Sequence, residues 1–433
     1  MRMGTFKHLS IFSLCFLVFS NVIKAQEAEE DLLPAVVEQL HSDNEVAKRL
    51  KISGYVQVQY QSADTAGISS MAGGSFGSGI DNRFSVRRGR VKFAYTFENA
   101  LAVMQFDITE KGLGIKDAYL SLTEPLLNTF SLTGGVFDRP FGYEISYSSS
   151  SRETPERSRL FQTLFPGERD LGAKLTIQAP KTSRWNFLKL DLGFINGNGT
   201  NVETDSYKDF IAHLSSTRSN SSETFKWGIG ASYYSGGFAM STAKSLSMTY
   251  VEGIDVFTPE AVKKGDRSNR TYYGIDGQMS YDWSPGITQI RAEYITGNQP
   301  GFEKSSSSLT ASATGDVYNR DFNGYYIYLM QNIMQSPFQA VIKYDVYDPN
   351  MAVSGENIGE VATSGITTGS ADVKYSTLGI GLNYRFNSNI KIMSYYDMVS
   401  NEITSRISSS STLTDLSNDR NDNVFTLRFQ YKF

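Results

Sequence analysis

Five basic side chains lie within ten residues in the N-terminal third of the chain, with no acidic residue among them: Arg83, Arg87, Arg88, Arg90 and Lys92. Arg88, Arg90 and Lys92 alternate with the apolar Val91 and Phe93, so in a β-strand they would share one face, about 7 Å apart. Such a column of cations suits anion conduction, and arginine can bind phosphate with two parallel hydrogen bonds. The alternative is that these cations only balance the charge of acidic residues elsewhere in the lumen.

Groups for catalysis or metal binding are scarce by comparison. Beyond residue 25 the only histidines are His41 and His213, and no acidic or nucleophile motif accompanies His213. No cluster of His, Asp and Glu has metal-ligand spacing, and the single cysteine is Cys15. We therefore predict no catalytic residues, no metal and no cofactor. The enzyme alternative is a barrel protease or phospholipase, which would need a histidine beside a carboxylate or serine.

The elements that must position these side chains are β-strands. From residue 52 onward, apolar and polar residues alternate with a period of two. Each segment is about ten residues long, the length of a tilted strand that crosses a bilayer, and an even number of strands can close. We predict sixteen strands in an all-β, transmembrane antiparallel β-barrel, at 52–61, 86–98, 100–108, 116–123, 130–138, 170–178, 187–195, 208–215, 224–235, 270–283, 286–297, 322–334, 337–347, 373–385, 389–399 and 423–433.

Composition supports this barrel. The 433 residues include 25 Tyr and 27 Phe, yet only 20% are charged and the mean hydropathy is −0.30. Outside the first 25 residues there is no apolar run of 18 or more, which excludes a helical membrane protein. A lipid-facing aromatic surface around a polar, water-filled lumen explains both observations.

The connections between the predicted strands alternate between short and long. Short links such as 98–100 and 284–286 alternate with long ones rich in Ser, Thr, Gly, Asn and Asp, which is the pattern of periplasmic turns and outer loops. The long connection 139–169 contains Arg139, Arg152, Arg157, Arg159 and Arg169. As the third outer connection it is expected to fold inward as a constriction. Four glutamates in it leave a surface loop with internal ion pairs as the alternative.

The two ends of the chain carry export signals. Residues 1–25 have a short basic start, an apolar stretch and a small residue before the predicted cleavage site, as in a secretory signal peptide; a single membrane anchor is the alternative. The last strand places Phe429, Tyr431 and Phe433 on one face. This strand resembles the recognition strand of bacterial outer-membrane barrels, which implies the barrel-assembly machinery and outer-membrane lipid as partners.

Residues 26–50 differ from the rest because their apolar residues recur at helical spacing. We predict a short periplasmic helical segment there, with a solvated tail as the alternative, and a barrel domain over 51–433. Removing Arg2, Lys7 and Lys24 with the signal leaves 38 basic against 45 acidic residues, a net charge of −7. An acidic, exported chain is a poor candidate for nucleic-acid binding.

Several motifs in the N-terminal third look like those of the phosphate-selective porin O and P family: VRRGRVKF at 86–93, KDAYLSL at 116–122, GGVFDRPFGYE at 134–144 and LFPGERDLG at 164–172. The resemblance implies a sixteen-stranded outer-membrane barrel, a homotrimer, a third loop folded inward, and small anionic solutes such as phosphate. Arg87, Arg88, Arg90 and Lys92 occupy the family's basic motif.

These observations favour a passive outer-membrane porin that forms a water-filled channel for small solutes, with a preference for anions or phosphate. The long Ser- and Thr-rich loops leave a second class open, a non-conducting binding or adhesion barrel or a subunit of an uptake complex. An outer-membrane enzyme is the third class.

Overall fold

The chain divides into two compact units, residues 1–51 and 52–433. The computed structural model describes residues 48–309, 314–361, 363–404, 413 and 415–433. The predicted signal peptide and nearly all of the predicted helical segment at 26–50 therefore lie outside the described residues. The first strand of the second unit begins slightly before the division, at Leu50.

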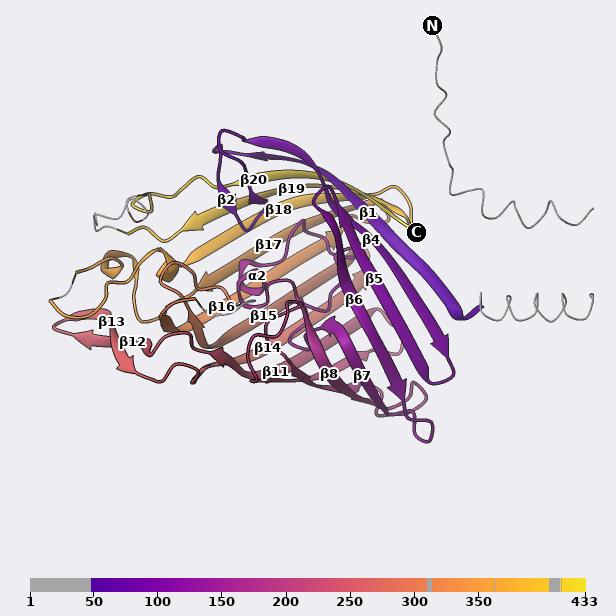
Figure 1. The fold of residues 1–433 in the computed structure, drawn as a ribbon. Coiled ribbons are helices and arrows are strands. Elements are labelled where there is room, and N and C mark those ends of the chain that lie inside the picture. The colour runs from indigo at the N-terminus through magenta and orange to yellow at the C-terminus, as the bar shows by residue number, and fades with distance from the viewer. Residues whose placement is uncertain (1–47, 310–313, 362, 405–412, 414) are drawn as a thin grey trace, which may run out of the picture. The chain divides into compact units, whose positions relative to one another are not determined.

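A single antiparallel sheet forms the wall of this unit (Figure 1). Each wall strand pairs with its neighbours along the chain, the last strand also pairs with the first, and the sheet thereby closes into a sixteen-stranded barrel. The fold prediction is confirmed, including the place of every predicted strand. The wall strands are β1 (Leu50–Ala63), β4 (Asn82–Phe97), β5 (Ala100–Thr109), β6 (Gly112–Thr123), β7 (Phe130–Asp138), β8 (Arg169–Gln178), β9 (Leu188–Ile195), β10 (Asp209–Ser219), β11 (Phe225–Ala239), β14 (Arg267–Trp283), β15 (Gly286–Gly301), β16 (Val317–Asn332), β17 (Phe338–Asp348), β18 (Tyr375–Arg385), β19 (Ile390–Asn401) and β20 (Val424–Lys432).

The remaining elements belong to the long connections. β2 (Ser69–Ser70) pairs with β3 (Gly74–Ser75), and the hairpin of β12 (Lys244–Val251) and β13 (Ile254–Ala261) extends from the rim between β11 and β14. One α-helix, α2 (Arg159–Leu164), and two 3-10 turns, η2 (Gly355–Asn357) and η3 (Ser370–Asp372), complete the described elements. Among the described residues, no helix is long and apolar enough to cross a membrane.

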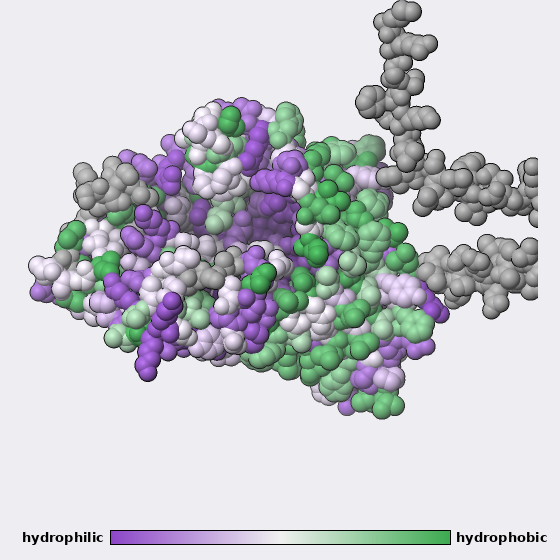
Figure 2. Space-filling model, viewed as in Figure 1, coloured by the Kyte–Doolittle hydropathy of each residue, from purple (hydrophilic) through white to green (hydrophobic). Residues whose placement is uncertain are grey.

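Alternation of side chains gives the wall two faces. In β20, Leu427, Phe429 and Tyr431 are exposed on the outside, whereas Thr426 and Arg428 are buried on the lumen side. The same pattern repeats around the wall, and Figure 2 shows a hydrophobic outer surface beside a hollow lined by hydrophilic residues. A barrel with this distribution suits lipid outside and water inside.

The wall is irregular at one place near the predicted cation column. The register between β5 and β6 shifts between Gln105 and Phe106, because Lys116 is an extra residue in β6. β6 begins at Gly112, so only residues 110 and 111 connect it to β5. This connection is thus much shorter than the segment 109–115 expected from the sequence.

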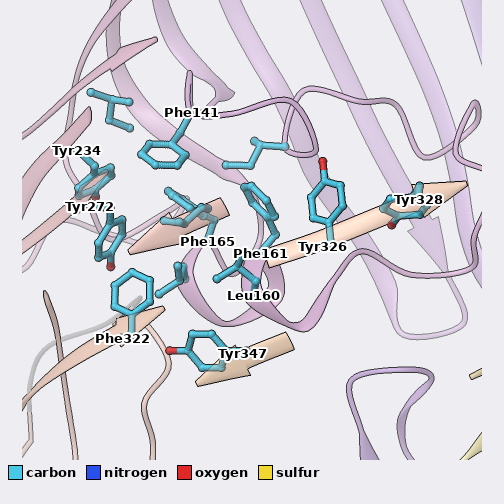
Figure 3. Close-up of a cluster of buried hydrophobic side chains, with 14 of the residues drawn as sticks. Phe141, Leu160, Phe161, Phe165, Tyr234, Tyr272, Phe322, Tyr326, Tyr328 and Tyr347 are labelled. Carbon is cyan, nitrogen blue, oxygen red and sulfur yellow. The ribbon is translucent and has the colours of Figure 1, made fainter. Parts of the chain in front are cut away.

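The connection between β7 and β8, residues 139–168, lies inside the barrel and contains α2. Its side chains form a core with aromatic residues of β11, β14, β16 and β17 (Figure 3). The lumen is consequently filled on that side, and the remaining cavities lie elsewhere around this loop.

Candidate pore and its constriction

Aromatic packing fixes one side of the loop 139–168 to the wall. Phe165 contacts Phe141, Phe161 and Tyr272, with ring centroids 5.0, 5.7 and 5.8 Å away (Figure 3). Phe161 also meets Tyr326 at 6.1 Å, and all of these side chains are at most 1% exposed. Burial of each such ring contributes about 1.5–3 kcal/mol, so this side is a strong anchor.

Carboxylates hold the backbone of the same segment. Glu293 on β15 accepts hydrogen bonds from the Tyr143 and Glu144 amides at 2.8 and 2.6 Å. Asp345 on β17 accepts a hydrogen bond from the Arg159 amide at 3.1 Å, at the start of α2, where backbone amides have no partner within the helix. Gly142 has a φ of +61°, and a Cβ there would collide with the Glu293 carboxylate. These contacts therefore fix the position of the loop backbone against the wall.

On the opposite side, the loop meets the wall through charged groups. The buried Glu156 carboxylate binds Arg87 of β4 at 2.7 Å, Arg88 of β4 at 3.1 Å and Arg428 of β20 at 2.9 Å. Burial alone would raise the pKa of Glu156, but the three arginines hold this pKa well below its usual range. Glu156 is thus an anion shared by three cations.

Glu168, the last residue of the loop, is a second shared carboxylate. It binds Arg157 of the loop, Lys116 of β6 at 3.1 Å and Arg169 of β8 at 2.9 Å. Its pKa is also held well below the usual range, because these cations outweigh the opposing effect of burial. Arg169 reaches Asp117 at 2.8 Å as well, which ties the end of the loop to β6.

A third set of contacts uses backbone carbonyls of the loop. Lys391 of β19 donates to the Arg152 carbonyl at 2.7 Å, Asn383 of β18 to the Glu153 carbonyl at 2.9 Å, and Arg428 to the Pro155 carbonyl at 2.7 Å. These donors come from adjacent wall strands. They place residues 150–156 against β18, β19 and β20.

The structure brings the predicted cation column to the lumen face, where most of its members are paired. Arg88 and Arg90 are buried, and Arg90 binds Asp107 at 3.2 Å and the Ser149 hydroxyl at 3.0 Å. Arg87 and Arg88 are consecutive yet both reach Glu156, so strand alternation is broken at this point. Lys92 is half-buried and forms no ion pair with a described residue.

The loop arginines have different surroundings. Arg139 is 1% exposed and pairs with Asp170 at 2.9 Å, and Arg159 stacks on the Tyr375 ring at 3.8 Å. Arg157 also donates to three loop carbonyls besides its ion pair with Glu168. Arg152 is buried, with no hydrogen-bond partner for its side chain among the described residues.

Cavities follow the charged side of the loop. An outer cavity of about 420 Å³ is lined by residues including Arg83, Arg87, Asp107 and Glu156. An inner cavity of about 330 Å³ lies further along the same strands, toward the short turns, and is lined by residues including Arg90 and Lys92. The Arg90–Asp107 pair lies between the two, since Arg90 lines the inner cavity and Asp107 the outer one, and the Arg87–Glu156 pair lines the outer cavity.

Two further cavities lie on the side of the short turns, of about 320 and 430 Å³. Together with the inner cavity they are lined by far more basic than acidic residues. The basic residues are Arg90, Lys92, Arg157, Arg169, Arg218, Lys226, Arg291, Arg385, Lys391 and Lys432, and the acidic residues are Asp117, Asp138 and Glu153. The outer cavity, by contrast, has three of each sign.

His213 has an acidic neighbour that the sequence did not indicate. Its Nε2 lies 3.1 Å from Asp276 Oδ2, although no acidic motif adjoins it in the sequence. Asp276 lies 63 residues away, and the two residues meet only because β10 and β14 both flank β11. Among the described residues, no group of three or more His, Cys, Asp or Glu could hold a metal ion.

Comparison with known proteins supports the fold. OmpF of Salmonella typhi, solved with daunomycin, aligns with a TM-score of 0.52 at 11% identity, over 89% of this chain and 97% of that one. An anion-selective porin from Comamonas acidovorans aligns with a TM-score of 0.50 at 11% identity, over 89% and 99%. The barrel has the outer-membrane porin fold. No family model matches the chain, and no curated protein matches it, so the resemblance to the phosphate-selective family stays a prediction.

Proposed function

We propose that this protein is an outer-membrane porin that lets small solutes, and preferentially anions, diffuse through its lumen. The observation that carries the proposal is the ten-to-three excess of basic over acidic residues around the three cavities beside the short turns. Fixed positive charge in a confined aqueous space raises the local concentration of anions and repels cations. Phosphate belongs to this class of solute, and the predicted roles of Arg87, Arg88, Arg90 and Lys92 are part of the proposal.

A passing anion loses least free energy when it contacts a cation that has no carboxylate partner. Lys92 and Lys432 both line the inner cavity, and neither forms an ion pair with a described residue. Arg88 and Arg90, in contrast, are held by Glu156 and Asp107. We infer that the two lysines govern selectivity, while the paired arginines set the width of the passage.

Reversal potentials across planar bilayers in a potassium chloride gradient, and then in phosphate, test this proposal. We expect anion preference for the wild-type protein and a several-fold lower anion-to-cation permeability ratio for Lys92→Glu combined with Lys432→Glu. Lys181→Glu, on an exposed short turn, is the control and should leave selectivity unchanged. Cation preference of the wild type would overturn the anion proposal, and absence of conductance would overturn the channel itself.

We also propose that copies of the barrel associate as a homotrimer through β5–β9. These strands have 8 to 12 residues, against 16 or 17 for β14–β16. Their outward residues include no Tyr or Trp, whereas exposed Tyr and Trp lie on β14 and β15 at Tyr273, Tyr281, Trp283 and Tyr294. An aromatic belt marks contact with the lipid interface, so a wall without one suits a protein neighbour.

Small outward residues on this short wall would let two barrels approach closely. Ala118 of β6 is one of them, and Ala340 of β17 is its counterpart on the aromatic part of the wall. Ala118→Trp should dissociate the assembly and Ala340→Trp should not, as measured by light scattering in detergent. A monomeric wild type would refute the trimer without bearing on conduction.

Location in the outer membrane completes the proposal. The signal peptide predicted at 1–25 would export the chain, and the last strand would present Phe429, Tyr431 and Phe433 to the barrel-assembly machinery. All three rings are 43–48% exposed on the outside of the barrel, where such a factor could reach them. Replacing all three by alanine should reduce the amount of folded, heat-modifiable barrel in isolated outer membranes, and an unchanged amount would refute the role.

A further inference from the structure

Arg152 differs from every other buried arginine in the described part of the chain. It is 2% exposed, and its Nε, Nη1 and Nη2 atoms all lack a hydrogen-bond partner among the described residues. The others with a buried unpartnered nitrogen have only one such atom each: Arg139, Arg159, Arg267, Arg270 and Arg320. A guanidinium carries five N–H donors, and burying this group without partners is costly.

The nearby carboxylates are already engaged. Glu156 and Glu168 each bind three other cations, and Glu153 binds Arg291 at 2.8 Å. Glu144 accepts hydrogen bonds from the Ser158 hydroxyl and from the Tyr328 hydroxyl, both at 2.7 Å. No described carboxylate forms an ion pair with Arg152.

Most of the charges that act on Arg152 have its own sign. Arg88, Arg157, Arg428 and Lys391 each interact with it repulsively, and Glu168 interacts with it attractively. These groups come from the loop and from three wall strands that pack around it. A further negative charge beside these cations would reduce their mutual repulsion.

The backbone keeps Arg152 from leaving this position. Its amide donates to the Ser148 carbonyl at 3.0 Å, and its carbonyl accepts Lys391 Nζ at 2.7 Å. The adjoining Glu153 carbonyl accepts Asn383 Nδ2 at 2.9 Å. These bonds fix the backbone from which the buried guanidinium extends.

We propose that Arg152 is the centre of an enclosed site for a small inorganic anion, a halide or a phosphate-sized oxyanion. The anion accepts the free N–H donors of Arg152 and offsets the positive charge of Arg88, Arg157 and Arg428. It thereby holds the loop against β4 and β18–β20. Arg152 does not line any of the four cavities along the loop. The proposed anion is therefore assigned a structural role, separate from that of a solute in transit.

Diffraction from crystals of the full chain grown in sodium bromide tests the site directly. We expect anomalous bromide density within hydrogen-bonding distance of the Arg152 guanidinium, or, in crystals grown in phosphate, tetrahedral density at the same place. Bromide density alone identifies a halide site, and phosphate density identifies an oxyanion site. Only water beside Arg152 under both conditions would overturn the proposal.

Thermal unfolding in detergent provides a second test. The wild-type midpoint should rise by a few degrees as chloride or phosphate replaces gluconate, because a ligand that binds only the folded state stabilises it. Arg152→Met should lose this dependence, and Arg184→Met, on an exposed turn, should keep it. An equal anion effect in Arg152→Met and the wild type would refute the site. Neither test measures conductance, so either result leaves the porin proposal to its own experiment.

Discussion

The two sides of the loop 139–168 meet the barrel wall in opposite ways. Toward β11 and β14–β17, Phe141, Phe161 and Phe165 pack into a closed aromatic core (Figure 3). Toward β1, β4 and β20, Glu156 gathers arginines, and cavities remain between loop and wall. One segment therefore fills the lumen at the aromatic core and leaves cavities on its charged side and beside the short turns.

The difference teaches how a pore can be narrowed without being closed. Apolar burial stabilises without directional demands and excludes water, so it suits an anchor. Buried ion pairs add little net stability, because desolvation offsets much of their attraction, but they keep charged groups along a watery path. The aromatic side holds the loop, and on the function proposed above the charged side selects which solutes pass it.

The largest effect is expected from a substitution that disrupts the aromatic side of the loop. Phe165→Ala removes a fully buried ring with four aromatic neighbours, and we expect the free energy of unfolding to fall by about 3–5 kcal/mol. The loosened loop should also raise single-channel conductance. Urea unfolding in detergent and bilayer recordings measure the two effects. Phe386→Ala, at a 64% exposed turn position, is the control; equal losses in both variants would contradict the anchor.

A smaller effect is expected on the charged side. Glu156→Gln leaves Arg87, Arg88 and Arg428 without their shared anion, but the outer cavity admits water to this place. We expect a loss of about 1–3 kcal/mol and a higher anion-to-cation permeability ratio, because one negative charge is removed from the lining of the outer cavity.

Glu110→Gln is the matched control, since Glu110 lines the same cavity but is exposed. Its stability should stay near that of the wild type. If Glu156→Gln costs as much stability as Phe165→Ala, the two sides are equal anchors and the comparison fails.

The strands of the wall and the faces of their side chains could be predicted, because both follow from local alternation in the sequence. A period of two in β4 places Arg88 and Arg90 on the lumen face, and the structure agrees. Their partners could not be predicted from the same pattern. Glu156 lies 68 residues from Arg88, and Arg428 lies 272 residues from Glu156. Such pairs depend on closure of the barrel and on the path of the loop.

The aromatic core also escaped prediction, although the sequence holds a signal for it. Tyr233–Tyr234, Tyr272–Tyr273 and Tyr325–Tyr326 are adjacent pairs, so each puts one ring outside the barrel and one inside. Outward tyrosines are expected at a lipid interface, but inward ones need an apolar partner in the lumen. An inward-folded loop rich in phenylalanine supplies that partner.

The smallest expected effect is a loss of stability at low pH, which comes from the charged side of the loop. The pKa values of Glu156 and Glu168 are depressed in the folded protein, so their ion pairs stabilise it fully above about pH 4.5 and progressively less as pH falls toward the folded values. The contribution of these ion pairs to stability should therefore be flat from pH 7 to 5 and decline below. Unfolding midpoints at pH 7, 5 and 3 measure this, and Glu156→Gln should show a shallower decline. The aromatic rings of Phe141, Phe161 and Phe165 do not titrate. An equal slope in wild type and Glu156→Gln would show that this shared carboxylate does not hold the loop.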